Sequence, residues 1–153
     1  MRFMFIIHSA SGMSPSHALM EAMHEMAQKE VAAGRMIYNG GLAPPSAGLQ
    51  LRLKSGKVVV LDGPFAETKE VIGGFAIFEL PDMTAAEQSA RDFLALHQRH
   101  LPGWEGVCEI RQIAGSQVEL IRSGGAWSGE VRERREGRPR AARRVPRRYP
   151  RRI

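Results

Sequence analysis

The sequence predicts an α+β fold in which residues 1–113 form a single sheet, with two β-α-β segments and a β-hairpin inserted between them. Three observations support this prediction. Short apolar runs alternate with two amphipathic helical segments, a two-residue turn joins two of the runs, and the pattern ends near Ile113. The 153 residues suffice for one domain with a hydrophobic core. We therefore expect a domain over residues 1–115 and a tail over residues 116–153.

The first β-α-β segment starts at the N-terminus. Residues 2–8 (RFMFIIH) form a short apolar run that predicts a strand. Ser14 and Pro15 predict the N-cap and the first residue of a helix, and Gly34 predicts its C-terminal end. Residues 35–42 (RMIYNGGL) predict the second strand. The apolar stripe expected on the helix consists of Leu19, Met20, Met23, Met26, Ala27 and Val31.

A β-hairpin is predicted next. Residues 49–53 (LQLRL) alternate between apolar and polar, and residues 57–61 (KVVVL) follow across Ser55-Gly56. This spacing and composition are typical of a two-residue hairpin turn. The alternation places Leu49, Leu51 and Leu53 on one face of the hairpin.

The second β-α-β segment repeats the order of the first. Residues 75–80 (FAIFEL) predict a strand, and Thr84 with Glu87 predicts a capping box that opens a helix reaching about His97. Residues 107–113 (VCEIRQI) predict the closing strand. The resulting order is the ferredoxin-like, or split βαβ, pattern with an inserted β-hairpin.

A sheet of this type carries helices on one face only. The predicted strands are nevertheless apolar on both faces, as in residues 3–7 and 58–61. A partner must then cover the second face. Because closed two-fold pairs dominate among oligomers, we expect a homodimer.

The charge of the chain is divided unevenly. The formal net charge is +6, but residues 116–153 hold twelve Arg, no Lys and four Glu, whereas residues 1–115 carry a net charge of −2. A single cysteine, Cys108, excludes an intrachain disulfide and favours a reducing compartment. The apolar run at residues 3–7 is too short for a signal peptide, and no segment approaches the roughly 20 apolar residues of a membrane span. We expect a cytoplasmic protein without membrane contact.

The arginine-rich tail contains Pro139, Pro146 and Pro150, which exclude a continuous helix there, so we expect it to be disordered. Three interpretations stay open. In the first, the tail is the translation product of GC-rich DNA beyond a lost stop codon or after a frameshift. In the second, it is a solvated extension. In the third, it binds phosphate backbones nonspecifically and with strong salt dependence. The first is favoured, so nucleic acid is not expected as a partner apart from such nonspecific contact.

Residues 61–80 (LDGPFAETKEVIGGFAIFEL) contain the unbroken string DGPFAETKE, and over about residues 1–114 the chain resembles the YCII-related, or DGPF, domain family. The helix ending AAG before GGL, the hairpin and the closing GWEGVCEIRQI support the match. The resemblance implies a dimeric ferredoxin-like fold of the dimeric α/β barrel type, with a cleft beside the sheet. It also implies lyase-like chemistry on ring compounds in some relatives. Family members are often encoded beside extracytoplasmic-function sigma factors, which implies a sigma factor as a further partner.

Relatives of the YCII type are proposed to use a histidine–aspartate pair. His17 in SPSHALM matches the place of that histidine at the start of the first helix. The place of the aspartate, just after the first strand, holds Ser9 instead. Asp62 is then the motif carboxylate that is able to replace it.

Asp62 ends a predicted strand and precedes Gly63 and Pro64, and two roles stay open for it. As a turn residue, its carboxylate accepts hydrogen bonds from downstream amides. As a catalytic residue beside an apolar wall, it acts as a general base. The catalytic candidates are Asp62, His17 and His8, where His8 ends the first strand and either points into a cleft or has a structural role. The substrate-binding candidates are Lys69 and Arg111 as anion anchors and Trp104 as a pocket wall.

His17, Glu21 and His24 share one side of the first predicted helix, a spacing that three Zn²⁺ ligands can adopt. The row lies opposite the apolar stripe, however, so a solvated face is favoured and no metal site is expected. Cys108 has no nearby basic activator and is expected to be an inert core thiol. No cofactor is expected.

Two hypotheses for function follow. The first is acid–base chemistry, lyase- or isomerase-like, on an unknown small organic molecule in a cleft near Asp62. The second is a noncatalytic module that binds a ligand or regulates a sigma factor.

Overall fold

The computed structural model describes residues 1–10, 13–62 and 70–124 and divides the chain into two compact units, residues 1–115 and 116–153. The first unit contains the strands β1 (Arg2–Ala10), β2 (Met36–Gly41), β3 (Leu49–Lys54), β4 (Lys57–Asp62), β5 (Glu70–Glu79) and β6 (Gly106–Gln112). It also contains the helices α1 (His17–Ala32) and α2 (Met83–His100) and a 3-10 turn at Pro45–Ala47. Each predicted strand and helix is therefore present.

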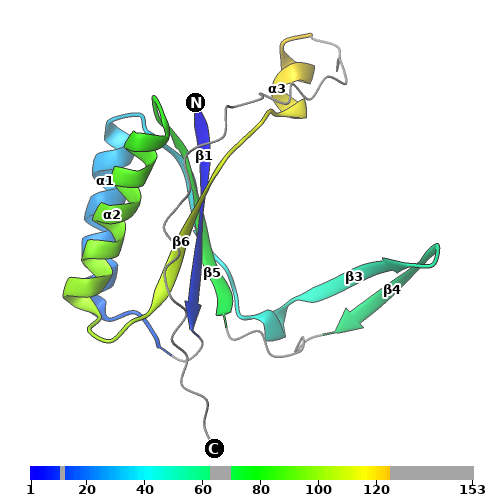
Figure 1. The fold of residues 1–153 in the computed structure, drawn as a ribbon, viewed down its shortest axis with the longest axis horizontal. Helices are drawn as coiled ribbons and strands as arrows, with labels where there is room; N and C mark the ends of the chain where they lie inside the picture. Colours follow the sequence, from blue (N-terminus) through cyan, green and yellow to red (C-terminus); the bar gives the residue numbers. More distant parts are fainter. Residues whose placement is uncertain (11–12, 63–69, 125–153) are drawn as a thin grey trace, which may run out of the picture. The chain divides into compact units, whose positions relative to one another are not determined.

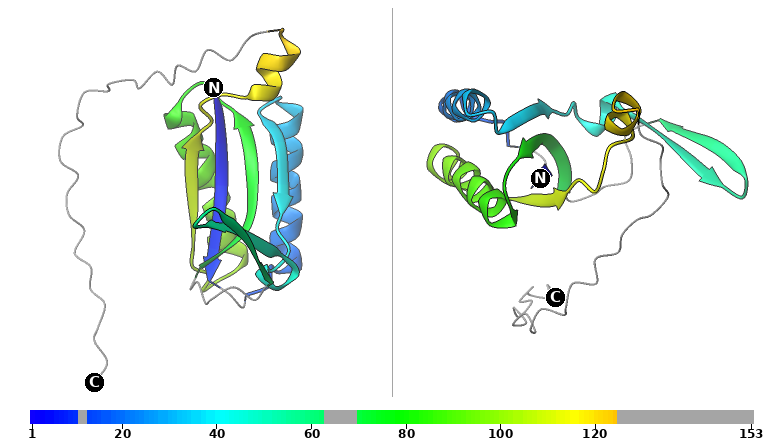
Figure 2. Two further views of the ribbon diagram at one scale, coloured as in Figure 1. Left: turned by 90° about the vertical axis from the view of Figure 1, so that its right-hand side faces the viewer. Right: turned by 90° about the horizontal axis from the view of Figure 1, so that it is seen from above.

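The four-stranded sheet has the order β2-β5-β1-β6, and each neighbouring pair is antiparallel. Figure 1 shows α1 and α2 side by side on one face of this sheet, and Figure 2 shows the four strands from the opposite side. The mixed α+β class is thus confirmed. The strand order and the one-sided helical layer are compatible with a ferredoxin-like fold.

The inserted hairpin does not extend the main sheet, and the prediction of one common sheet is wrong in this respect. Within the described residues, β3 and β4 pair with each other and with no other strand. The predicted two-residue turn is confirmed, since Ser55 (φ 51°) and Gly56 (φ 74°) both adopt the left-handed conformation that a type I′ turn requires. Pro44 and the 3-10 turn interrupt the extended chain between β2 and β3, which explains why the hairpin leaves the sheet.

Helix α1 begins two residues later than predicted. Ser16, not Ser14, is the N-cap, and its Oγ accepts a hydrogen bond from the Leu19 amide at 3.1 Å. The predicted C-terminal end is confirmed. Gly34 has φ +70° and donates its amide to Val31, while the Arg35 amide bonds to Glu30, which together form a Schellman motif.

Helix α2 begins two residues earlier and ends three residues later than predicted. Asp82 is the N-cap, because its Oδ1 accepts a hydrogen bond from the Ala85 amide at 2.8 Å, which places Thr84 inside the first turn. Glu87 forms an ion pair with Arg91 instead of a capping box.

The hydrophobic core lies between the sheet and the helices. Phe5 and Phe78 contact each other from neighbouring strands with ring centroids 4.7 Å apart. Full burial of such a ring contributes about 1.5–3 kcal/mol relative to an exposed one, so these rings anchor the helical layer. The buried members of this core cluster are Phe3, Phe5, Phe78, Leu80, Ala86 and Ala90.

The buried part of α1 is narrower than predicted. Leu19 is fully buried, but Met20 and Val31 of the predicted stripe are more than half exposed. These two residues lie at the margins of the stripe, outside the part of α1 that contacts the sheet.

In the second unit, Gln117–Arg122 forms the short helix α3, with Ser116 as its N-cap. This helix was not predicted, because the sequence analysis assigned the whole tail to disorder. In the described part of the chain, no helix is long and apolar enough to cross a membrane.

Candidate functional site

The face of the sheet that points away from the helices carries a mixed polar and apolar surface, which we call the open face. Phe3 and Phe5 of β1 enter the core, so Met4, Ile6 and His8 point to the other side. Cross-strand partners share a face. The pairing of β1 with β5 and β6 therefore adds Phe75, Ile77, Val107, Glu109 and Arg111 to the open face.

Three of these side chains form a hydrogen-bonded cluster. Nε2 of His8 lies 2.9 Å from Oε2 of Glu109, and Nε of Arg111 donates to Oε1 of the same carboxylate. The side chain of His8 is 22% exposed, whereas that of Arg111 is 70% exposed. The cluster therefore has a sheltered end at the imidazole and an open end at the guanidinium.

The pKa of Glu109 lies below its ordinary value, because Arg111 and then His8 form hydrogen bonds to its carboxylate. An ionised carboxylate on one ring nitrogen orients an imidazole and favours a proton on that nitrogen. Within the described residues, Nδ1 of His8 has no hydrogen-bond partner. That nitrogen can therefore exchange a proton with a bound molecule.

His8 lies two residues before the end of β1, so the prediction that it ends the strand is wrong. The strand continues to Ala10, and the pairing with β5 shifts by one residue between Ile7 and His8. The extra residue of this bulge is Gly73 of β5, so β1 keeps its regular alternation and His8 shares a face with Met4 and Ile6. Position on the open face, not the end of a strand, makes His8 a candidate.

His17 does not join this cluster. It is the first residue of α1, 89% exposed, with Nδ1 lying 3.6 Å from Oε2 of Glu21. His24, further along α1, forms a hydrogen bond with the side chain of Gln28. Among the described residues, no group of three or more His, Cys, Asp or Glu side chains is arranged to hold a metal ion.

Asp62 is the last residue of β4, opposite Leu49, but its side chain and the segment 63–69 lie outside the described residues. The turn and general-base roles of Asp62 both stay predictions. The same holds for Lys69 as an anion anchor.

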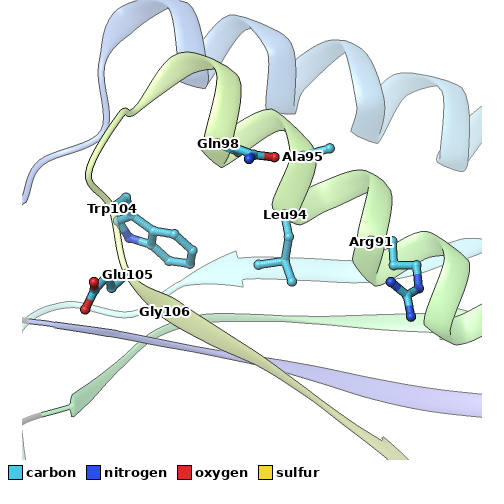
Figure 3. A pocket seen from close by; sticks show the side chains of 7 residues that line it. All are labelled: Arg91, Leu94, Ala95, Gln98, Trp104, Glu105 and Gly106. Atoms are coloured by element: carbon cyan, nitrogen blue, oxygen red, sulfur yellow. The ribbon is translucent and has the colours of Figure 1, made fainter. Parts of the chain in front are cut away.

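Trp104 lines a surface hollow of about 470 Å³ between α2 and the start of β6. Figure 3 shows Trp104 at one end of this hollow and Arg91 at the other. The hollow lies on the helical side of the sheet, so Trp104 and the side chain of His8 do not meet. Its role as a wall for a substrate stays a prediction. The residues that line the hollow are Arg91, Leu94, Ala95, Gln98, Trp104, Glu105 and Gly106.

The buried residue that contacts Trp104 is His97, to which the sequence pattern assigns no role. The ring of His97 lies 4.4 Å from the rings of both Phe93 and Trp104, and its Nδ1 bonds to the Phe93 carbonyl. Burial lowers the pKa of His97. Cys108 also faces the core, and burial raises the pKa of its thiol to about 11, so the thiol is protonated at neutral pH, in agreement with the expected inert role.

Glu109 is a candidate site residue that the sequence pattern alone did not single out. Its signal is nonetheless present, because Glu109 and Arg111 stand two residues apart in an apolar strand and therefore share a face. His8 follows the same alternation on β1. The pairing of β1 with β6 was needed to bring the three together.

Comparison with known proteins identifies a family and a relative. The family model of the YCII-related domain matches residues 1–113. An uncharacterized protein of Rhizobium meliloti (strain 1021) is 34% identical over 86 residues, which cover 56% of this chain and 69% of that protein.

Proposed function

The chain belongs to the family of YCII-related domains, and on that premise we propose that the open face carries out acid–base chemistry on a small organic molecule. His8 is the proton-transferring group, Glu109 orients it, and Arg111 attracts an anionic part of the substrate. The expectation of lyase- or isomerase-like chemistry is thereby kept, but its centre moves from the Asp62–His17 pair to β1 and β6.

The observation that carries this proposal is the 2.9 Å contact between Nε2 of His8 and the Glu109 carboxylate. A general base needs a partner that holds its tautomer and its direction, and a carboxylate on the far nitrogen supplies both. The imidazole of His8 is mostly buried but still partly exposed, so a substrate can contact it. His17 lacks such shelter, because it lies on the solvent side of α1.

A binding site needs walls, and the described residues of one subunit supply them on one side only. Met4, Ile6, Phe75 and Ile77 of the open face surround the cluster with apolar side chains that α1 and α2 do not cover. We propose that a second copy of the chain covers them, in an assembly of the dimeric α/β barrel type. The substrate then lies between apolar walls, where an ionised partner acts more strongly than in water.

The proposed function can be tested with an activated substrate that reports any sheltered base. 5-Nitrobenzisoxazole opens to a coloured phenolate when a base removes one proton. We expect the protein to accelerate this opening and His8→Gln to lower the rate about 100-fold, the usual weight of a positioned general base. Glutamine keeps a hydrogen-bond donor for Glu109, so the strand pairing stays intact.

The matched control is His24→Gln, which removes an exposed histidine of α1 and is expected to leave the rate unchanged. Equal rates for the wild type and His8→Gln would refute the proposal. Turnover that depends on Asp62 instead would return the site to the carboxylate of the DGPF motif. An absence of turnover from all variants, with binding of small carboxylates at the open face, would favour the noncatalytic ligand-binding or regulatory module.

A further inference from the structure

The β3–β4 hairpin presents one continuous apolar face to solvent, and its residues do not enter the core of their own subunit. The register pairs Leu51 with Val60 and Leu53 with Val58, so these four side chains share a face, together with Leu49. Each of the five is between 57% and 73% exposed. An isolated two-stranded hairpin is marginally stable in water, so this face requires a partner surface.

The same subunit carries a second uncovered apolar surface, the open face around Met4, Ile6, Phe75 and Ile77. Figure 1 shows the hairpin as an arm separate from the four-stranded sheet. One surface is therefore a flat apolar ribbon, and the other is a sheet face that none of the described helices and strands covers. Each copy of the chain offers one of each, so a two-fold pair satisfies both at once.

Charge favours the same occupant. Residues 49–62 hold three basic residues and one acidic residue, a net charge of +2. The rest of residues 1–115 hold seven basic and eleven acidic residues, a net charge of −4. The register places Arg52, Lys54 and Lys57 on the face opposite Leu51, so their charge acts on the acidic body of a second copy through long-range attraction and not through contacts beneath the docked hairpin.

We propose that the β3–β4 hairpin docks its apolar face on the open face of a second copy and closes the partner's His8–Glu109 cluster from solvent. The inference deepens the proposed function, because it makes each site complete only in the dimer. The wall consists of Leu51, Leu53, Val58 and Val60 from the other protomer. Docking of the hairpin also explains why apolar residues lie next to a charged cluster on the open face.

Two adjacent valines provide a matched test. Val60 lies on the apolar face opposite Leu51, whereas Val59 lies on the other face opposite Arg52, and they are 57% and 45% exposed, respectively. We expect Val60→Lys to raise the dimer dissociation constant, measured by sedimentation velocity, by about tenfold or more, because the charge would be buried without a partner. Val59→Lys is expected to leave it unchanged. Equal effects of the two variants, or no effect of either, would overturn the proposal.

A second measurement locates the hairpin. In full-length protein with Cys108→Ser, a spin label at Ser55→Cys marks the hairpin tip. In a mixture of labelled and ¹⁵N-enriched protomers, we expect broadening of open-face amides, such as those of Ile6 and Ile77, in the enriched protomer. Broadening elsewhere, or none between protomers, would overturn the docking. Neither readout involves turnover, so failure of the acid–base proposal would leave this result interpretable by itself.

Discussion

Gly106 is the residue at which the packing of Trp104 leaves no room for a side chain. A Cβ built there would lie 2.2 Å from Cζ2 of Trp104 and 2.6 Å from the carbonyl oxygen of His8. Either the indole or the β1–β6 pairing must then move. We expect Gly106→Ala to lower the free energy of unfolding by about 1–3 kcal/mol, measured by urea denaturation.

Gly115→Ala is the control for that substitution, because a Cβ at Gly115 meets nothing within 4 Å. Its effect is expected to stay within about 0.5 kcal/mol. If the two variants unfolded alike, the close contact between Trp104 and the start of β6 would not contribute to stability.

His97 links the stability of the protein to pH. Burial disfavours its protonated form and lowers its pKa below the ordinary value of 6.5. Between the two pKa values the unfolded chain binds more protons than the folded one, so stability falls as the pH falls below 6.5. We expect His97→Phe, which keeps an aromatic ring beside Trp104, to flatten the pH dependence of the unfolding free energy. His24→Gln is the control, and an unchanged slope in His97→Phe would contradict the prediction.

Helix α1 depends on a cap that also joins it to α2. Oγ of Ser16 accepts the Leu19 amide at 3.1 Å and donates to the carbonyl oxygen of His100 at 2.8 Å. We expect Ser16→Ala to destabilise the protein by about 0.5–2 kcal/mol, because it leaves both backbone groups without this partner. Thermal unfolding followed by circular dichroism measures the loss. Ser14→Ala, which changes the cap expected from the sequence, should leave the stability nearly unchanged. If Ser14→Ala were the more destabilising of the two variants, Ser14 would be the N-cap and the helix would begin two residues earlier.

The elements themselves were largely predictable, but their ends were less so. Apolar periodicity located α1 and α2, and the Ser55-Gly56 turn located the hairpin, because these signals depend on neighbours along the chain. Ser14 and Thr84 were wrong as caps, since several polar residues near each helix start compete for the same amides. The hydrogen bond between Ser16 and His100 is a tertiary contact, so no local sequence pattern predicts that Ser16 is the cap.

The chain as a whole joins two units of opposite charge. Residues 1–115 form one compact unit with a net charge of −2, while residues 116–153 carry twelve Arg against four Glu. We expect the full chain to be retained on heparin at low salt and a 1–115 variant to pass through, because the tail holds the excess positive charge. Both proteins should show the same unfolding midpoint within about 2 °C. Retention of the shortened chain would place a polyanion-binding surface on the first unit.

Local order along the chain decided the class of fold, the strands and the helices α1 and α2 of the first unit, the turn of the hairpin and the division of charge. Family membership also followed from a local string, DGPFAETKE. Each of these depends on spacing within a few residues, which the sequence displays directly. The separation of the hairpin from the main sheet, the burial of His97 and the meeting of His8 with Glu109 depended on tertiary structure. His8 and Glu109 are 101 positions apart, and the register of β1 against β6 alone sets their contact.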